Sequence, residues 1–153
     1  MTKPNYTVKD LMLAYLKEAG IAASKSKVGV NFQHSGWNFL LWHDTHDPVF
    51  FRLTLPGIFD VTDDSYASAL MACNMLNWKY KVVKLSLYEY NEGEERRASV
   101  WVCYEQVVDD PATFNTLVSR AMNALMEVAE QFLNFRHTET SRNKKRLAHY
   151  FFN

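Results

Sequence analysis

The sequence has few cysteines, glycines and prolines, and neither sign of charge is in excess. Its 153 residues contain two Cys, five Gly and four Pro, which is too little Gly and Pro for a low-complexity chain. Seventeen Lys and Arg balance seventeen Asp and Glu, so the net charge gives no indication of a nucleic-acid partner. Cys73 and Cys103 are far apart and form no C-x-x-C pair. We therefore expect reduced thiols and a cytoplasmic protein.

Long apolar runs are also absent. No stretch approaches the roughly 20 apolar residues that a membrane-spanning helix needs, and residues 1–6 have no apolar run after their charge. We therefore expect neither a signal peptide nor a membrane partner. The hydrophobic share of 48% and the length suit one domain with a hydrophobic core.

Aromatic residues, in contrast, are abundant. Ten Phe, eight Tyr and four Trp make up 14% of the chain. Side chains of this size are either buried in the core or displayed on a surface that binds something. The sequence must therefore be searched for an aromatic surface.

Two helices have clear boundaries. Thr7 is expected to cap the first helix, which ends at Gly20. Asp110, followed by a proline, is expected to cap the longest helix, whose apolar stripe runs to Leu133.

A third helical segment lies between them. Thr62 or Asp63 is expected to cap it. Its predicted apolar face consists of Tyr66, Ala69, Leu70, Cys73 and Leu76.

Five segments have the composition and alternation of strands. They are residues 28–33, 37–43, 49–55, 80–90 and 97–107, and Pro56-Gly57 is expected to end the third. The order α-β-β-β-α-β-β-α, with short connections, predicts an α+β fold: an antiparallel five-stranded sheet with helices packed on one face. We divide the chain into a single α+β domain, residues 1–136, and a basic and aromatic C-terminal extension, residues 137–153.

The strand alternation separates two sets of residues on opposite faces of the sheet. The set expected beneath the helices is Val30, Phe32, Phe39, Leu41, Phe51, Leu53, Val83, Leu85, Leu87, Val100 and Val102. The opposite set is Leu40, Trp42, Phe50, Arg52, Lys84, Tyr88 and Trp101. Large aromatic side chains mixed with cations are typical of protein interfaces. We predict a protein-binding surface made of Leu40, Trp42, Phe50, Arg52, Tyr88 and Trp101. The alternative is cross-strand packing alone, or coverage by the aromatic residues 150–152.

The segment WHDTHDP, residues 42–48, contains two His and two Asp. His43 and His46 can ligate zinc, but the nearest other histidine, His34, lies at the far end of a strand. Asp and Pro are favoured in turns, and the segment separates two strands. We therefore predict a turn, with no metal and no cofactor. A small-ligand or metal-dependent enzyme that uses the His43/His46 loop remains the alternative.

Signatures of catalysis are missing. The sequence contains no G-x-S-x-G, no phosphate-binding glycine pattern and no H-E-x-x-H. The paired acids at residues 63–64 and 109–110 precede helices, where exposed N–H groups favour carboxylates. We predict a non-catalytic protein with no catalytic residues.

The order of elements resembles type III secretion chaperones and the related YbjN-type proteins, which are described as regulators of sensory transduction. The resemblance covers about residues 5–135. It rests on the capped first helix, on FFRLTLPG at residues 50–57, and on a hairpin followed by a long helix that starts with D-D-P. Secretion chaperones are usually acidic whereas this chain is neutral, which favours the YbjN-type group.

The resemblance implies a dimeric protein that binds other polypeptides along strands and apolar patches. We therefore expect another polypeptide and a second copy of the chain, in a homodimer, as partners. A purely structural subunit, with the aromatic face sealed inside a permanent complex, remains a further alternative.

Overall fold

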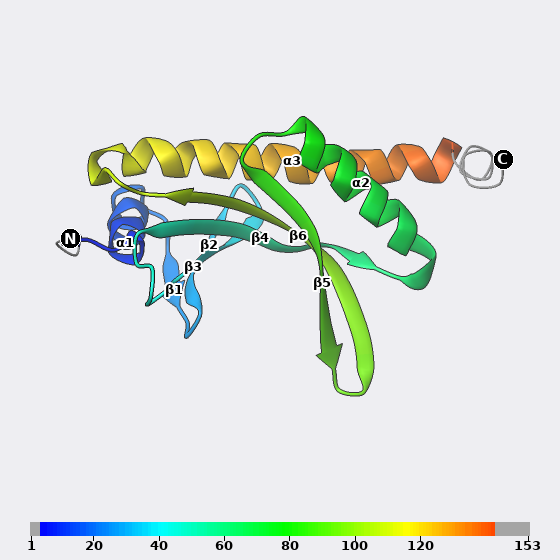
Figure 1. The fold of residues 1–153 in the computed structure, drawn as a ribbon, viewed down its shortest axis with the longest axis horizontal. Helices are drawn as coiled ribbons and strands as arrows, with labels where there is room; N and C mark the ends of the chain where they lie inside the picture. Colours follow the sequence, from blue (N-terminus) through cyan, green and yellow to red (C-terminus); the bar gives the residue numbers. More distant parts are fainter. Residues whose placement is uncertain (1–3, 143–153) are drawn as a thin grey trace.

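The computed structural model describes residues 4–142, which form one sheet covered on one face by helices (Figure 1). The helices are α1 (Val8–Glu18), α2 (Tyr66–Lys79) and α3 (Phe114–Arg142). Short 3-10 turns, Asp63–Ser65 and Pro111–Thr113, lead into α2 and α3. The strands are β1 (Ala23–Lys25), β2 (Gly29–His34), β3 (Trp37–Trp42), β4 (Phe50–Val61), β5 (Val83–Glu92) and β6 (Glu95–Val107).

The sheet is antiparallel with strand order β1-β2-β3-β4-β6-β5. The α+β class and the position of the helices on one face are confirmed, but the predicted count of five strands is wrong because β1 adds a sixth. All three residues of β1 are exposed, so no alternation of buried and polar positions marked it in the sequence. Its pairing with β2, from Ala23 opposite Phe32 to Lys25 opposite Val30, defines it.

β4 is longer than predicted. Pro56 and Gly57 do not end the strand; the register with β6 shifts between Leu55 and Phe59, and pairing resumes up to Val61. Proline cannot donate to the ladder, and Gly57 has φ 61, which a side chain disfavours. The two residues therefore form a β-bulge inside a continuous strand.

The predicted helix starts are confirmed. The Thr7 Oγ1 accepts the backbone N–H of Asp10 at 3.1 Å, and the Asp110 Oδ1 accepts that of Ala112 at 2.9 Å. The helix α3 continues beyond its apolar stripe to Arg142, so the predicted boundary between residues 136 and 137 falls within a helix. The aromatic residues 150–152 lie outside the described residues.

The hydrophobic core lies between the helices and the inner face of the sheet. Phe39, Phe51, Phe114 and Phe132 are fully buried, and Phe51 meets Phe114 edge to face with ring centroids 5.9 Å apart. A buried side chain of this kind contributes about 1.5–3 kcal/mol. The predicted inner-face residues are buried except Leu87, which is half-buried where β5 leaves the helices.

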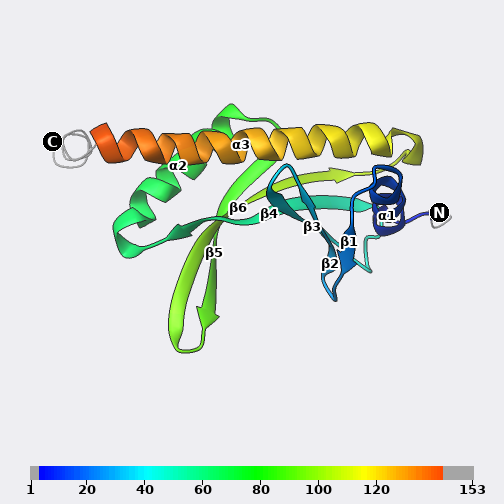
Figure 2. The same cartoon turned by 180° about the vertical axis from the view of Figure 1, so that it is seen from behind.

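The paired strands β5 and β6 extend past the rest of the sheet as a two-stranded arm that points away from the helices (Figures 1 and 2). Across the described residues, none of the helices combines the length and apolar character needed to cross a membrane.

Candidate functional site

Four aromatic rings form a row across the outer face, which is the face of the sheet opposite the helices. Trp42 on β3 lies 6.3 Å from Trp101 on β6, measured between ring centroids. Trp101 lies 4.7 Å from Tyr88 on β5, which in turn lies 6.1 Å from Tyr90. These spacings allow favourable ring contacts. We call these four residues the aromatic row.

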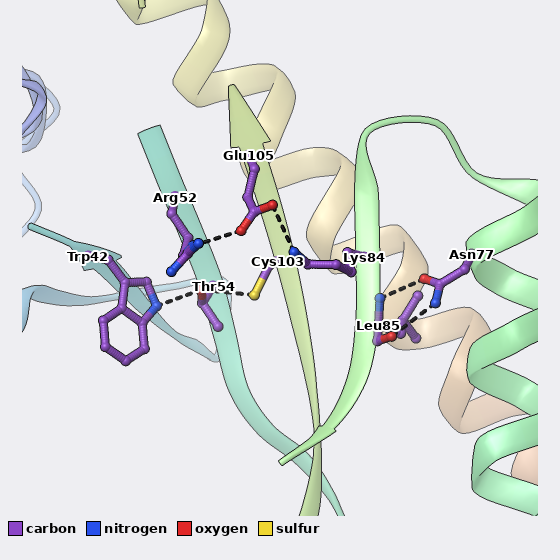
Figure 3. A network of polar contacts seen from close by, with 8 residues as sticks. All are labelled: Trp42, Arg52, Thr54, Asn77, Lys84, Leu85, Cys103 and Glu105. Atoms are coloured by element: carbon purple, nitrogen blue, oxygen red, sulfur yellow. Dashed lines mark hydrogen bonds and ion pairs between the residues drawn. The ribbon is translucent and has the colours of Figure 1, made fainter. Parts of the chain in front are cut away.

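The polar edges of both indoles are satisfied within the sheet. The Trp42 Nε1–H donates to the Thr54 Oγ1 at 3.0 Å, and the Trp101 Nε1–H donates to the Ser99 Oγ at 2.9 Å. Thr54 is fully buried and also lies 3.3 Å from the Cys103 Sγ (Figure 3). The indoles are therefore fixed in orientation, and what they offer to solvent is apolar ring surface.

Charged side chains lie beside the aromatic row. The Glu105 carboxylate bridges Arg52 Nε at 2.7 Å and Lys84 Nζ at 2.9 Å (Figure 3). Partial burial works to raise the pKa of Glu105, but hydrogen bonds from Lys84 and Arg52 outweigh it, and the pKa is lowered. The Arg52 guanidinium also lies 5.5 Å from the centre of the Phe50 ring. This end of the outer face thus presents a cation held in place on an aromatic ring.

The predicted site residues come together on the outer face. Phe50 and Arg52 lie at one end, Trp42 and Trp101 in the middle, and Tyr88 toward the arm.

The predicted site residues differ in how much of each side chain is exposed. Tyr88 is 50% exposed, whereas the predicted site residue Leu40 is only 7% exposed and offers little surface to a partner. Tyr90 was missed, although the same two-residue alternation after Tyr88 could have identified it.

A second apolar surface lies on α2 and was not predicted. Tyr66 and Leu70 do not point into the core as expected: they are exposed, while Ala69, Cys73 and Leu76 are buried. Large apolar residues occupy both sides of this helix, so periodicity alone could not tell which side faces the core. The exposed set on α2 and the bend that follows it, which we call the α2 stripe, is Tyr66, Leu70, Met71, Met75, Trp78 and Val82.

Trp78 dominates the α2 stripe because it is 91% exposed. An indole of this size contributes 150–250 Å² when buried. Contiguous apolar surface of several hundred Å² typically marks an interaction site.

The His43/His46 loop forms the predicted turn. The Asp44 carboxylate accepts the backbone N–H groups of His46 at 2.8 Å and of Asp47 at 3.2 Å, and these bonds lower its pKa. Within residues 4–142, no three His, Cys, Asp or Glu side chains are grouped as a metal site would require. The contacts of Asp44 are those of a structural turn.

Neither cysteine has the lowered pKa of an activated thiolate. Burial raises the pKa of the Cys73 thiol to about 11, and burial also raises the pKa of Cys103. A thiol with a raised pKa is a poor nucleophile at neutral pH.

A hollow of about 660 Å³ lies at the β1 edge of the sheet, between the end of α1 and strands β1–β3. Its lining is Gly20, Ile21, Ala22, Ala23, Ser24, Asn31, Phe32, Gln33, Asn38, Phe39 and Pro56. None of these side chains titrates, so the lining offers no group for acid–base chemistry.

Comparison with known proteins gives a match in structure only. No protein-family model matches the chain, and no curated protein matches its sequence. Among solved structures, the chain is similar to the crystal structure of YbjN from E. coli, described as "a putative transcription regulator". The TM-score is 0.62 at 11% sequence identity, over 83% of this chain and 92% of that one. A likeness at this identity concerns the fold and leaves the predicted link to secretion chaperones a prediction. The chain has the YbjN-type fold.

Proposed function

We propose that this chain is a non-catalytic regulatory module that binds another polypeptide on its outer sheet face. The observation that carries the proposal is the aromatic row, whose rings stay partly exposed although both indole N–H groups have partners. A sheet face left in water is usually mostly polar. Aromatic and arginine side chains are the commonest anchors of protein interfaces, and Arg52 adds the second kind.

The packing of the row favours binding. Each ring contacts its neighbour, and both Trp42 and Trp101 are held by hydrogen bonds. Side chains that are already ordered lose little entropy when a partner covers them. A partner therefore gains contact area at a low ordering cost.

The enzymatic alternative has less support. The Asp44 carboxylate accepts two backbone N–H groups within the turn, and the thiols of Cys73 and Cys103 have raised pKa values. A regulatory role also agrees with the description of the YbjN structure. We also propose a cytoplasmic location, which the two free cysteines support.

We further propose that a second copy of the chain covers the α2 stripe. Large exposed apolar side chains gathered on one surface, such as those of the α2 stripe, are normally covered by a partner. Two copies related by a two-fold axis would bring one stripe against the other, so each Trp78 would be buried in the partner copy. A stable dimer buries about 800 Å² per partner, so residues beside the stripe must add to its area.

The experiment uses each surface as the control for the other. Random peptides displayed on phage are selected on the wild-type protein, and each selected peptide is then measured on Tyr88→Ala and Trp78→Ala. We expect Tyr88→Ala to lose at least fivefold in peptide affinity while remaining dimeric. We expect Trp78→Ala to become monomeric in light scattering while it still binds the peptides.

Three results would contradict the proposal. Peptides whose affinity is insensitive to Tyr88→Ala would place the binding surface elsewhere. A monomeric wild-type protein in light scattering would contradict the proposed homodimer. Circular dichroism that shows either variant to be unfolded would mean that its surface belongs to the core.

A further inference from the structure

A small hollow of about 360 Å³ opens on the outer face where the arm leaves the sheet. Its lining is Pro56, Gly57, Asp60, Tyr88, Tyr90, Ser99 and Trp101. The volume is at the lower end of the range for ligand pockets, so the hollow suits a single side chain.

The bulge in β4 creates the space. Gly57 has φ 61 and no side chain, and a Cβ at this position would lie 4.0 Å from the Ser99 Oγ. Any residue larger than glycine would therefore be strained and would project beside Ser99. The rings of Tyr88, Tyr90 and Trp101 also line the hollow.

These three rings present apolar faces. The Trp101 N–H donates to the Ser99 Oγ, and the ring centroids of Tyr88 and Trp101 are only 4.7 Å apart. The face of an aromatic ring is electron-rich and attracts cations. Within the described residues, cations lie over the rings of Phe50 and Tyr80 and over none of these three.

Among the residues that line the hollow, the one charged residue, Asp60, is negative. Asp60 lies opposite Ser99 on the neighbouring strand, and its carboxylate forms no hydrogen bond or ion pair with any other described residue. The nearby cation Arg97 is held by two acids, Glu92 at 3.2 Å and Glu95 at 3.0 Å. Lys84, farther along β5, is held by Glu105. The hollow thus combines aromatic faces with an unneutralised carboxylate.

We propose that this hollow binds an arginine side chain of the polypeptide that occupies the outer face. A planar guanidinium stacks on aromatic rings and matches a carboxylate with paired N–H groups, as Asp60 would require. The inference rests on the proposed function and specifies the chemistry of the partner: an extended segment with a basic residue opposite the arm.

The test titrates the full chain with N-acetyl-arginine amide and, in parallel, with the neutral isostere N-acetyl-citrulline amide. The indole N–H resonance of Trp101, assigned with Trp101→Phe, reports on the hollow by NMR. We expect saturation by the arginine compound in the millimolar range and at least fivefold weaker binding of the citrulline compound. Asp60→Asn should weaken arginine binding about fivefold. Asp64→Asn removes the same charge from an exposed acid outside the hollow and should leave it unchanged.

Equal binding of the two compounds would overturn the inference, because the hollow would then be merely apolar. Unchanged arginine affinity in Asp60→Asn, or no shift of the Trp101 resonance, would overturn it as well. Failure of the proposed function looks different: selected peptides would then be insensitive to Tyr88→Ala. Peptides that need Tyr88 but carry no basic residue and ignore Asp60→Asn would leave the function intact and refute only the arginine site.

Discussion

Replacing Asn77 with Ala tests how the edge of the sheet is protected. Asn77 lies on α2, and its Nδ2–H donates to the carbonyl oxygen of Leu85 at 3.0 Å (Figure 3). In return, the Leu85 N–H donates to the Asn77 Oδ1 at 2.7 Å. β5 is the last strand of the sheet, so these backbone groups of Leu85 have no neighbouring strand to bond. The Asn77 amide takes the place of that strand.

The expected loss follows from the two bonds. Each net hydrogen bond contributes about 0.5–1.5 kcal/mol, so two contribute about 2 kcal/mol. Leu85 is buried, which limits how well water replaces the amide. Alanine recovers about 0.5 kcal/mol through its higher helix propensity. Asn77→Ala should therefore lower the free energy of unfolding by about 1.5 kcal/mol, and Tm by about 3–6 °C.

The assay is urea unfolding followed by tryptophan fluorescence. Asn74→Ala is the matched control because Asn74 is exposed on the same helix: it gains the same propensity and loses no side-chain hydrogen bond to another described residue. Asn77→Asp keeps an acceptor for the Leu85 N–H but sets an oxygen against the Leu85 carbonyl, so it should also destabilise. If Asn77→Ala unfolds within 0.5 kcal/mol of Asn74→Ala, the reasoning is refuted.

Three further predictions concern stability and reactivity. Thr54→Val leaves the Trp42 N–H without its acceptor and should cost about 1–2 kcal/mol in urea unfolding, whereas an unchanged midpoint would show that the bond contributes nothing. The pKa of Glu105 in the folded protein is lowered, so the stabilisation by its ion pairs is fully present above the ordinary glutamate pKa of 4.5 and is lost as the pH falls through the folded pKa. The stability difference between wild type and Glu105→Gln, measured by urea unfolding from pH 7 to pH 3, should therefore shrink toward zero; a constant difference contradicts this. Because the pKa of Cys73 is about 11, only about one thiol in a thousand is ionised at pH 8, and native iodoacetamide labelling of Cys73 should be far slower than in urea; equal rates in peptide mass spectrometry would contradict its burial.

The sequence by itself determined the elements whose signals are local. Thr7 and Asp110 accept the first N–H groups of their helices, and a cap depends only on residues a few positions away. Strand alternation likewise separated the buried inner face from the outer face, because a side-chain period of two depends on backbone geometry alone. Most of the outer-face site, including Trp42 and Trp101, followed from that alternation.

Only the tertiary structure decided the features that depend on distant partners. β1 is polar and exposed, and it exists because β2 offers a ladder to pair with. The bulge at Pro56 appears as a strand end until β6 is seen to pair on both sides of it. α2 is apolar on both sides, so the side that faces the core depends on how its small Ala and Cys residues pack there.

The two surfaces of functional interest show the same division. Tyr88 and Trp101 could be placed on the outer face from the sequence, but Asp60 joins them only because three strands align it beside their rings. Trp78 appeared to be an ordinary helical residue until the fold left it exposed. Alternation fixes the direction of each side chain, whereas the contacts it makes depend on pairing between strands and helices far apart in the chain.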